Sequence, residues 1–490
     1  MQASAYPEAV RLPEPAQGGH LAVVLASGIS FCAIAGLFAA GQGPLLRVAI
    51  PAVASLLALV LYFQRPIVYV QFTLWIWFLT PWLRRLVDWR FGFAEPNFIL
   101  LTPFLVAAIA GITLFRRDPQ FPMRIPPTFV FCGTAIFYGF VVGMVLHPSG
   151  ETIYGFVNWL SPLLFGLHLC MRWQDYEKHR DAIRRTFVLG ILVMGIYGIY
   201  QYAVAPALDV YWLFNVQSPN SLAPSFGLPE PFLLRIWSTL NAPGPFADVM
   251  MVGLLLLLGT KSKLKIPAAL VGYFTLLLSA VRTAWLGWVV GIVLTLRRSK
   301  PILLIRLALS GALLAVCLVF FMKVQPLQSQ VTDRLQTMSS LESDSSFSDR
   351  AAMYEALTTE ALTAPFGSGV SNSNEWHNFM IDSGFLVIFL SFGWFGTVAF
   401  LTGVVLFLWH TRKNSSSENL DEFQIACRAI CIALLMQMVG GNVFTGVLGA
   451  MFWIFAGMIF ASQTHGEQEP ALVETATPEN LTLRPVNQVG

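Results

Sequence analysis

The sequence has few charged residues for its length. Of 490 residues, 12% are Asp, Glu, Lys or Arg and 56% are hydrophobic, whereas a soluble protein has about 25% charged residues. A compact fold surrounded by water could not cover its surface with so few charges. This scarcity excludes a soluble enzyme, a nucleic-acid binder and a disordered scaffold, and it predicts a polytopic membrane protein.

The sequence also lacks the usual cysteine, metal and nucleotide motifs. Its six cysteines lie within or beside apolar runs, and no pair has metal-ligand spacing supported by histidines. No Walker loop, GxGxxG or HExxH motif occurs at a useful position. We therefore expect no disulfide framework, no metal and no cofactor. The first twenty residues lack the basic region and cleavage site of a signal peptide.

Long apolar runs are what the sequence does contain. A helix that crosses a bilayer needs about 20 mostly apolar residues. Several of the apolar runs are shorter than this, so we expect about 12–14 crossings. We therefore predict an all-α polytopic integral membrane protein. The fourteen candidate spans lie near 21–40, 45–63, 66–82, 97–115, 127–146, 152–171, 185–204, 244–259, 264–280, 282–296, 302–323, 385–409, 424–440 and 442–461.

The lysines and arginines of the short loops indicate the orientation of these spans. Cytoplasmic loops carry an excess of both residues, and here the excess is obtained when both chain ends are cytoplasmic. We accordingly expect a bacterial cytoplasmic membrane protein with its active face on the periplasmic side. The expected layout is a cytoplasmic tail (1–20), N-terminal membrane helices (21–204), a long outer loop (205–243), membrane helices (244–323), a second long outer loop (324–384), C-terminal membrane helices (385–461) and a cytoplasmic tail (462–490).

The two long outer loops read as functional segments, because loops of such length are uncommon in compact proteins. The first, 205–243, is rich in aromatic residues that suit either the membrane interface or stacking on sugar rings. The second, 324–384, contains a predicted helix over 350–363. Ser346 and Asp349 fit a capping box before it, and a Pro-Phe-Gly step follows it.

The positive charges predicted on the outer face are almost all arginines. The arginine guanidinium binds phosphate oxygens with a planar fork, so these residues are candidates for holding a diphosphate or a glycan. Simpler interpretations remain open: general abundance of arginine, a snorkelling side chain at Arg282, pairing with nearby acids, or a loop charge pair with Asp88. The candidates are Arg84, Arg85, Arg235, Arg282, Arg334 and Arg350.

A candidate base lies in the second outer loop. His377 is the only histidine in that loop, and histidine titrates near neutrality, which suits removal of a proton from a hydroxyl. Glu375 and Asp382 are the alternatives, because a pocket can bring a carboxylate to a useful pKa. A loop histidine that only bonds its neighbours is the competing interpretation.

Four motifs resemble one family. Ser279–Gly287 (SAVRTAWLG) is similar to the Arg-containing motif of the O-antigen ligase and Wzy polymerase superfamily, and 235–245 (RIWSTLNAPGP) resembles the segment that precedes it. Pro365–Gly369, His377-Asn378 and 393–397 (GWFGT) resemble its third block. The segment 81–88 (PWLRRLVD) is similar to an N-terminal segment of exopolysaccharide polymerases. The likeness is strongest over about 230–400.

The resemblance implies a metal-independent glycosyltransferase on the outer face of the membrane. Members of this family transfer glycan from an undecaprenyl-diphosphate-linked donor to a hydroxyl of a glycan or lipid-linked acceptor. It implies arginines that hold the diphosphate, a histidine as the base in the ligases, and a flippase and a chain-length regulator as partners beside the membrane lipids.

Three functions follow as hypotheses. The step Ile381–Gly384 (IDSG) is similar to the polymerases, so a polymerase of exopolysaccharide or O-antigen repeat units is expected. The His377-Asn378 pair supports the second hypothesis, a ligase that joins glycan to lipid or protein. The third comes from another class, a solute transporter. Polar residues within the spans would suit it: Asn158, Gln201, Gln437 and Asn442.

Overall fold

The computed structural model describes residues 18–116, 125–216, 226–296, 361–371, 375–376, 379–381, 383–413 and 421–475, with short pieces between 305 and 359. Within these residues, ten helices are long and apolar enough to cross a membrane and three shorter ones are apolar. The prediction of an all-α polytopic membrane protein is confirmed.

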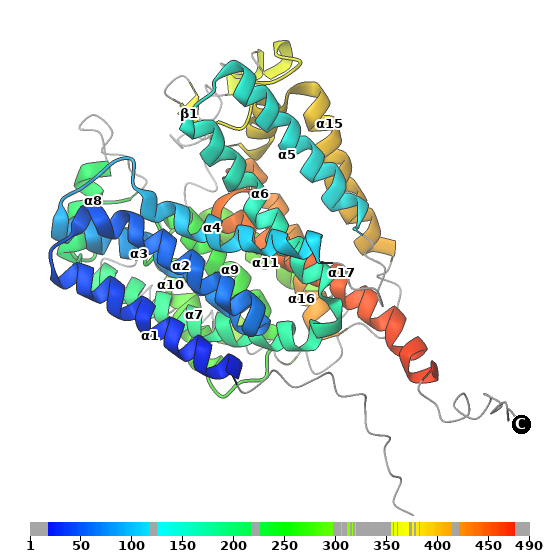
Figure 1. Cartoon of the computed structure of the whole chain (residues 1–490), viewed down its shortest axis with the longest axis horizontal. Helices are drawn as coiled ribbons and strands as arrows, with labels where there is room; N and C mark the ends of the chain where they lie inside the picture. Colours follow the sequence, from blue (N-terminus) through cyan, green and yellow to red (C-terminus); the bar gives the residue numbers. More distant parts are fainter. Residues whose placement is uncertain are drawn as a thin grey trace, which may run out of the picture.

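Seven of the ten helical segments that are long and apolar enough to cross a membrane lie in the first half of the chain, whose elements Figure 1 shows in blue to green. Prolines occupy the first turn of several of these helices, where their missing N–H costs nothing. The elements are α1 (Gly18–Ala39), α2 (Gly43–Gln64), α3 (Pro66–Phe91), η1 (Phe98–Leu101), α4 (Thr102–Ala108), η2 (Ile109–Phe115), α5 (Pro127–Leu146), α6 (Gly150–Met171), η3 (Trp173–Asp175) and α7 (Tyr176–Val204).

The second half adds shorter helices and one small hairpin. Strands β1 (Glu375–Trp376) and β2 (Phe379–Met380) pair antiparallel, and the described residues between Tyr354 and Thr363 are helical. Most of the candidate span 302–323 lies outside the described residues. The remaining elements are α8 (Ala207–Val216), α9 (Pro243–Leu258), α10 (Lys265–Leu278), α11 (Arg282–Leu296), α15 (Gly384–Lys413), α16 (Glu422–Met436), η6 (Gln437–Val439) and α17 (Gly446–Thr475).

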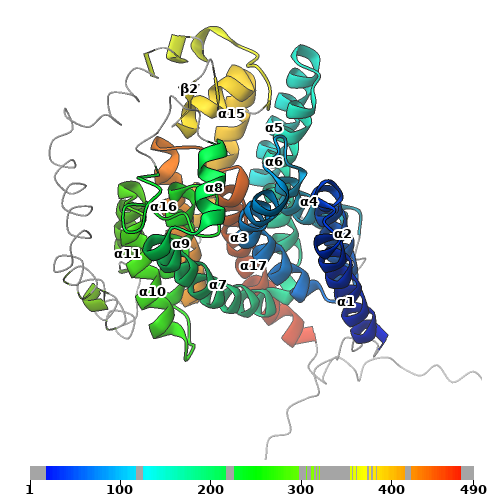
Figure 2. The ribbon, with the colours of Figure 1, turned by 90° about the vertical axis from the view of Figure 1, so that its left-hand side faces the viewer.

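Helix α9 lies at the centre of the bundle. Every residue from Phe246 to Leu258 is buried, and α7, α10, α11, α16 and α17 all contact it. Figure 2 shows α9 and α7 between α10 and α11 on one side and α1 and α2 on the other. In contrast, α1 is not buried inside the protein, as expected for an apolar helix that faces lipid.

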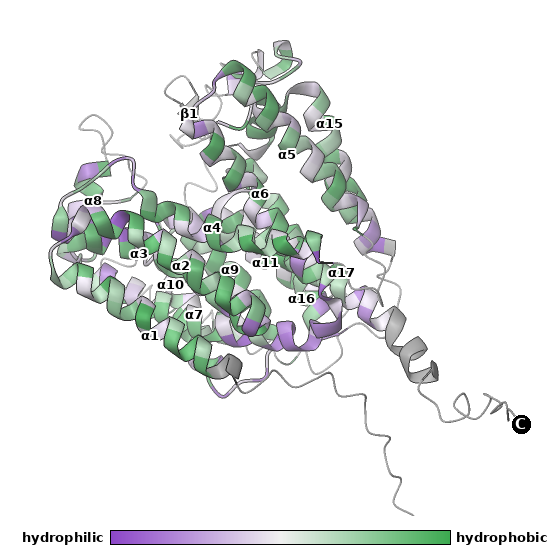
Figure 3. Cartoon of the chain, in the orientation of Figure 1, coloured by the Kyte–Doolittle hydropathy of each residue, from purple (hydrophilic) through white to green (hydrophobic). Residues whose placement is uncertain are grey.

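Hydrophilic residues gather at the two opposite ends of the helices. Figure 3 shows one group near α8 and the end of α3, and another near the start of α7 and the end of α15, with hydrophobic ribbon between them. We call these the α8 end and the α7 end. This distribution is the one expected of helices that cross a bilayer side by side.

The third motif block packs against a break in α15 that glycine makes possible. Helix α15 breaks at Gly393, where φ is 56° and ψ is −161°, and Trp394 N donates to Pro365 O over 2.8 Å. Before this break, Ser368 N donates to Leu390 O over 2.8 Å and Gly369 N to Ser391 O over 3.1 Å. The Pro365–Gly369 motif therefore pairs with both an N–H group and carbonyl groups that the broken helix leaves without an internal partner.

Gly155 on α6 gives the sharpest test of this packing. A Cβ atom there would lie 1.5 Å from Val370 O, so Gly155→Ala is expected to cost about 1–3 kcal/mol or more through overpacking. Gly133 on α5 has no atom within 4 Å of such a Cβ, so Gly133→Ala is the control and should be neutral. Unfolding of both purified variants in detergent measures the difference. Equal stability of the two would contradict the close approach.

Candidate functional site: arginines at the α8 end

Arg84 lies in a charge network at the end of α3. Its Nε is 3.1 Å from Asp88 Oδ2 and its Nη2 is 2.7 Å from Glu95 Oε2. The other oxygen of Asp88 accepts from Asn97 Nδ2 over 2.9 Å and from Arg47 Nη2 over 3.3 Å. The side chains of Arg84 and Asp88 are 4% and 0% exposed, whereas that of Glu95 is 62% exposed, so two arginines and two carboxylates balance one another at the border between buried and exposed regions.

Arg85 forms a buried ion pair with an acid that sequence reasoning missed. Its Nε lies 2.9 Å from Asp209 Oδ1 on α8, and both side chains are 0% exposed. The second oxygen of Asp209 accepts from Tyr197 Oη over 2.9 Å and from Gln201 Nε2 over 2.7 Å. A buried charge pair needs such additional hydrogen bonds to offset its desolvation.

The same residues hold the 235–245 segment in place. Arg85 donates from Nη1 to Leu240 O and from Nη2 to Ser238 O. The Gln201 side-chain oxygen accepts from Trp237 N over 3.0 Å and from Ser238 N over 2.8 Å. Ser238 has φ of 51°, a left-handed conformation that costs energy in a residue other than glycine. These contacts fix the segment directly after Arg235.

Arg235 binds the backbone of the turn between α10 and α11. Its Nε donates to Ser279 O and its Nη2 to Ala280 O, each over 3.2 Å. Ala280 has φ of 52°, so the planar guanidinium holds a strained turn. Arg282, which is partly buried, begins α11 two residues later. Arg85 therefore links the 81–88 segment to the 235–245 segment, and Arg235 links the 235–245 segment to the turn before Arg282.

A second contact fixes the start of α11. Gln437 Nε2, in η6, donates to Thr283 O over 2.8 Å. A Cβ atom at Gly287 would lie 2.5 Å from the same Nε2 atom and 2.6 Å from Met251 Sδ. The glycine of the SAVRTAWLG motif therefore leaves room for the Gln437 and Met251 side chains beside the start of α11.

The structure corrects one predicted span and leaves several candidate site residues undescribed. The expected end of the third span at residue 82 is wrong, because α3 continues to Phe91 and holds Arg84 and Arg85 in helix and not in a loop. The reason is that Asp88 and Asp209 neutralise the arginines, so the last turns can be buried. Glu375 lies in β1, while its side chain lies outside the described residues, as do four further candidates: Arg334, Arg350, His377 and Asp382.

One further buried acid stands near the motif segments. Asp248 on α9 is 6% exposed, and its Oδ1 has no hydrogen-bond partner among the described residues. In the sequence, Asp248 could have been found as an acid inside an apolar run, and Asp209 as an acid within an aromatic-rich segment. Each is an expensive group in a membrane protein.

Comparison with known proteins gives one match. Residues 267–401 match the family model described as O-Antigen ligase, while no curated protein matches the chain. The match includes the Arg282 motif and the third block, and it excludes 81–88 and 235–245. It supports a ligase- or polymerase-type function in glycan biosynthesis with lipid-linked glycan substrates. Residues 267–401 are therefore similar to the O-antigen ligase family, which confirms the resemblance drawn from the motifs within that range.

Proposed function

We propose that this protein polymerises glycan repeat units carried on undecaprenyl diphosphate, in exopolysaccharide or O-antigen synthesis. The reaction would take place at the α8 end, on the extracytoplasmic face of the bacterial inner membrane. The observation that carries the proposal is the linked series of arginine-bearing segments in a chain whose 267–401 segment matches the O-antigen ligase family. A diphosphate leaving group needs donors of this kind.

The arginines take different parts in this proposal. Arg282 would contact the diphosphate, with Arg334 and Arg350 as further candidates. Arg85 is 0% exposed, forms an ion pair with Asp209 and donates to two backbone carbonyls, so we assign it a positioning role. Arg84 lies at the border of the site, bound to Asp88 and Glu95. The proposed base is His377, with Glu375 or Asp382 as the alternative, and metal independence is part of the proposal.

A ligase is the second candidate, because the matching family model carries that name. Deleting the gene from its host distinguishes the two reactions. A polymerase predicts that single repeat units accumulate on undecaprenyl diphosphate, whereas a ligase predicts that full-length glycan accumulates there. Unchanged glycan on every carrier would contradict both.

The polar residues that suggested a transporter have structural partners. Asn158 Oδ1 accepts from Gly446 N over 2.8 Å, and Asn442 Oδ1 accepts from Phe444 N over 3.0 Å. Gln201 and Gln437 bind the backbone beside the Arg235 and Arg282 motifs. Since each of the four side chains satisfies a buried or partly buried backbone group, they give no separate support for a solute pathway.

Arg235→Lys tests the link between two motif segments. Lysine keeps the charge but loses the fork that holds the carbonyls of Ser279 and Ala280. A displacement of about 1 Å can cost about a hundredfold in rate, so long-chain product should fall by about that factor at normal protein level. Arg90→Lys, at an exposed position on α3, is the control. Full activity of Arg235→Lys would contradict the proposed role of Arg235 in positioning the Arg282 motif.

A further inference from the structure

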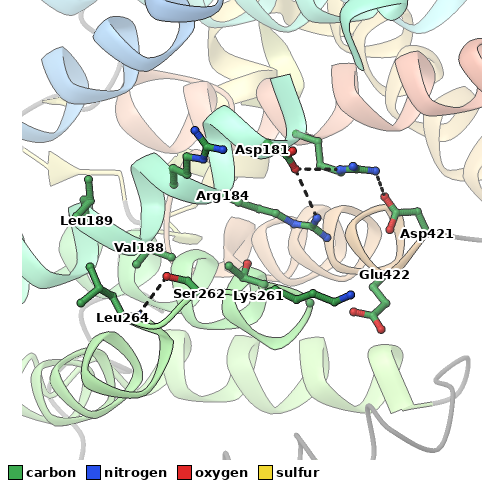
Figure 4. A pocket seen from close by; sticks show the side chains of 13 residues that line it. Asp181, Arg184, Val188, Leu189, Lys261, Ser262, Leu264, Asp421 and Glu422 are labelled. Carbon is green, nitrogen blue, oxygen red and sulfur yellow. Dashed lines mark hydrogen bonds and ion pairs between the residues drawn. The ribbon is translucent and has the colours of Figure 1, made fainter. Parts of the chain in front are cut away.

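A pocket lies at the α7 end, far from the motif segments. Its volume is about 820 Å³, and it is lined by the start of α7, the turn between α9 and α10, and the start of α16. Figure 4 shows side chains from all three elements pointing toward one space. The orientation expected from the loop charges puts this end in the cytoplasm.

The charges in the pocket are unevenly neutralised. Arg180 is bound on two sides, to Asp421 Oδ2 at 3.1 Å and to Asp181 Oδ1 at 3.3 Å. Arg184 reaches Asp181 only at 3.9 Å, and its buried Nε has no hydrogen-bond partner among the described residues. Asp181 and Asp421 are therefore engaged by arginines, while the buried Nε–H of Arg184 is left without an acceptor among the described residues.

Two more basic side chains line the same space. Arg185 and Lys261 are exposed, and neither forms an ion pair with any residue that the structure describes. Figure 4 shows the Lys261 side chain ending near Glu422, with no interaction drawn between the two. Arg184, Arg185 and Lys261 thus offer several donors to an incoming anion.

The rim of the pocket is apolar. Leu189 and Leu264 line it and are 44% and 43% exposed, and Val188 lies beside them. An acyl chain can pack on such a rim while its headgroup enters the charged part. Basic pockets between membrane helices on the cytoplasmic side are typical sites for anionic lipid headgroups.

We propose that this pocket binds a phosphate group, carried either by an anionic lipid headgroup or by a free phosphate. The phosphate oxygens would accept from Arg184 Nε, the Arg185 guanidinium and the Lys261 ammonium, which are charge-assisted hydrogen bonds. The site is separate from the proposed glycan chemistry and does not depend on it. Its occupancy would join α7 and the α9–α10 turn at one end of the bundle.

Binding is measured on the purified full chain in detergent, from the rise of its unfolding temperature with added ligand. Three probes separate the sources: dioctanoyl phosphatidylglycerol, inorganic phosphate, and dioctanoylglycerol, which has the same chains without phosphate. Arg185→Gln and Lys261→Gln should each weaken binding about fivefold, the effect of one basic charge near a phosphate. Lys263→Gln is the matched control, since Lys263 is exposed in the same turn and does not line the pocket.

The outcomes discriminate directly. Stabilisation by phosphatidylglycerol alone supports the site and identifies a lipid headgroup, while stabilisation by inorganic phosphate as well supports it and identifies phosphate itself. Stabilisation by dioctanoylglycerol to the same extent would overturn the proposal, because the chains would then account for binding. So would the absence of any effect, or equal losses in Lys261→Gln and Lys263→Gln.

Discussion

An Arg282→Ala variant is expected to make about a hundredfold to a thousandfold less long-chain glycan than the parent chain, which is the usual cost of removing one preorganised donor that stabilises developing charge. Arg282 begins α11 directly after the turn that Arg235 holds. We propose that its guanidinium stabilises the leaving diphosphate. The measurement is the length distribution of polysaccharide from a deletion strain that carries the variant.

The control must separate chemistry from folding. Arg90 is an exposed arginine of α3, so Arg90→Ala changes the same charge without removing a motif contact and should leave glycan length unchanged. The amount of each variant in the membrane fraction is determined in parallel. Normal glycan from Arg282→Ala at a normal protein level would exclude this residue from the site.

Breaking the Arg85–Asp209 pair is expected to lower the free energy of unfolding by about 3–5 kcal/mol, because an uncompensated charge stays buried. Both side chains are 0% exposed, so water cannot solvate whichever partner remains. Arg85→Ala and Asp209→Ala should each show this loss when the purified protein is unfolded in detergent. The 235–245 segment should loosen in Arg85→Ala, since Ser238 and Leu240 lose their donor.

A double variant tests whether the pair itself is responsible. Arg85→Met with Asp209→Leu removes both charges and keeps apolar volume, so it should be more stable than either single variant. Exposed Arg90 again supplies the control, with an effect within about 0.5 kcal/mol. If Arg85→Ala unfolded as the parent chain does, the buried pair would not hold the site together.

The membrane helices were largely predictable because hydrophobic length is a local property. The runs near 127–146 and 282–296 correspond to α5 and α11 and needed no tertiary information. The end of α3 was not predictable in this way. Arg84 and Arg85 read as a loop because only Asp88 is near them in the sequence, while Asp209, the partner of Arg85, lies on α8.

The candidate site was predictable in its residue types and not in its contacts. The motif pattern singled out Arg235 and Arg282, but it could not reveal that Arg235 binds the carbonyls of Ser279 and Ala280. Backbone acceptors leave no trace in the sequence. The need for glycine at position 155 could not be predicted either, because it arises from Val370, which only the fold brings close to Gly155.

Chain elongation by the purified protein measures the proposed polymerase reaction itself. The protein in lipid vesicles is given undecaprenyl-diphosphate-linked repeat units, and the products are separated by length. We expect a ladder of multiples of one repeat unit from the parent chain and from Arg90→Ala, and almost none from Arg282→Ala. Single repeat units left unchanged by a folded parent chain, or an equal ladder from Arg282→Ala, would contradict this expectation.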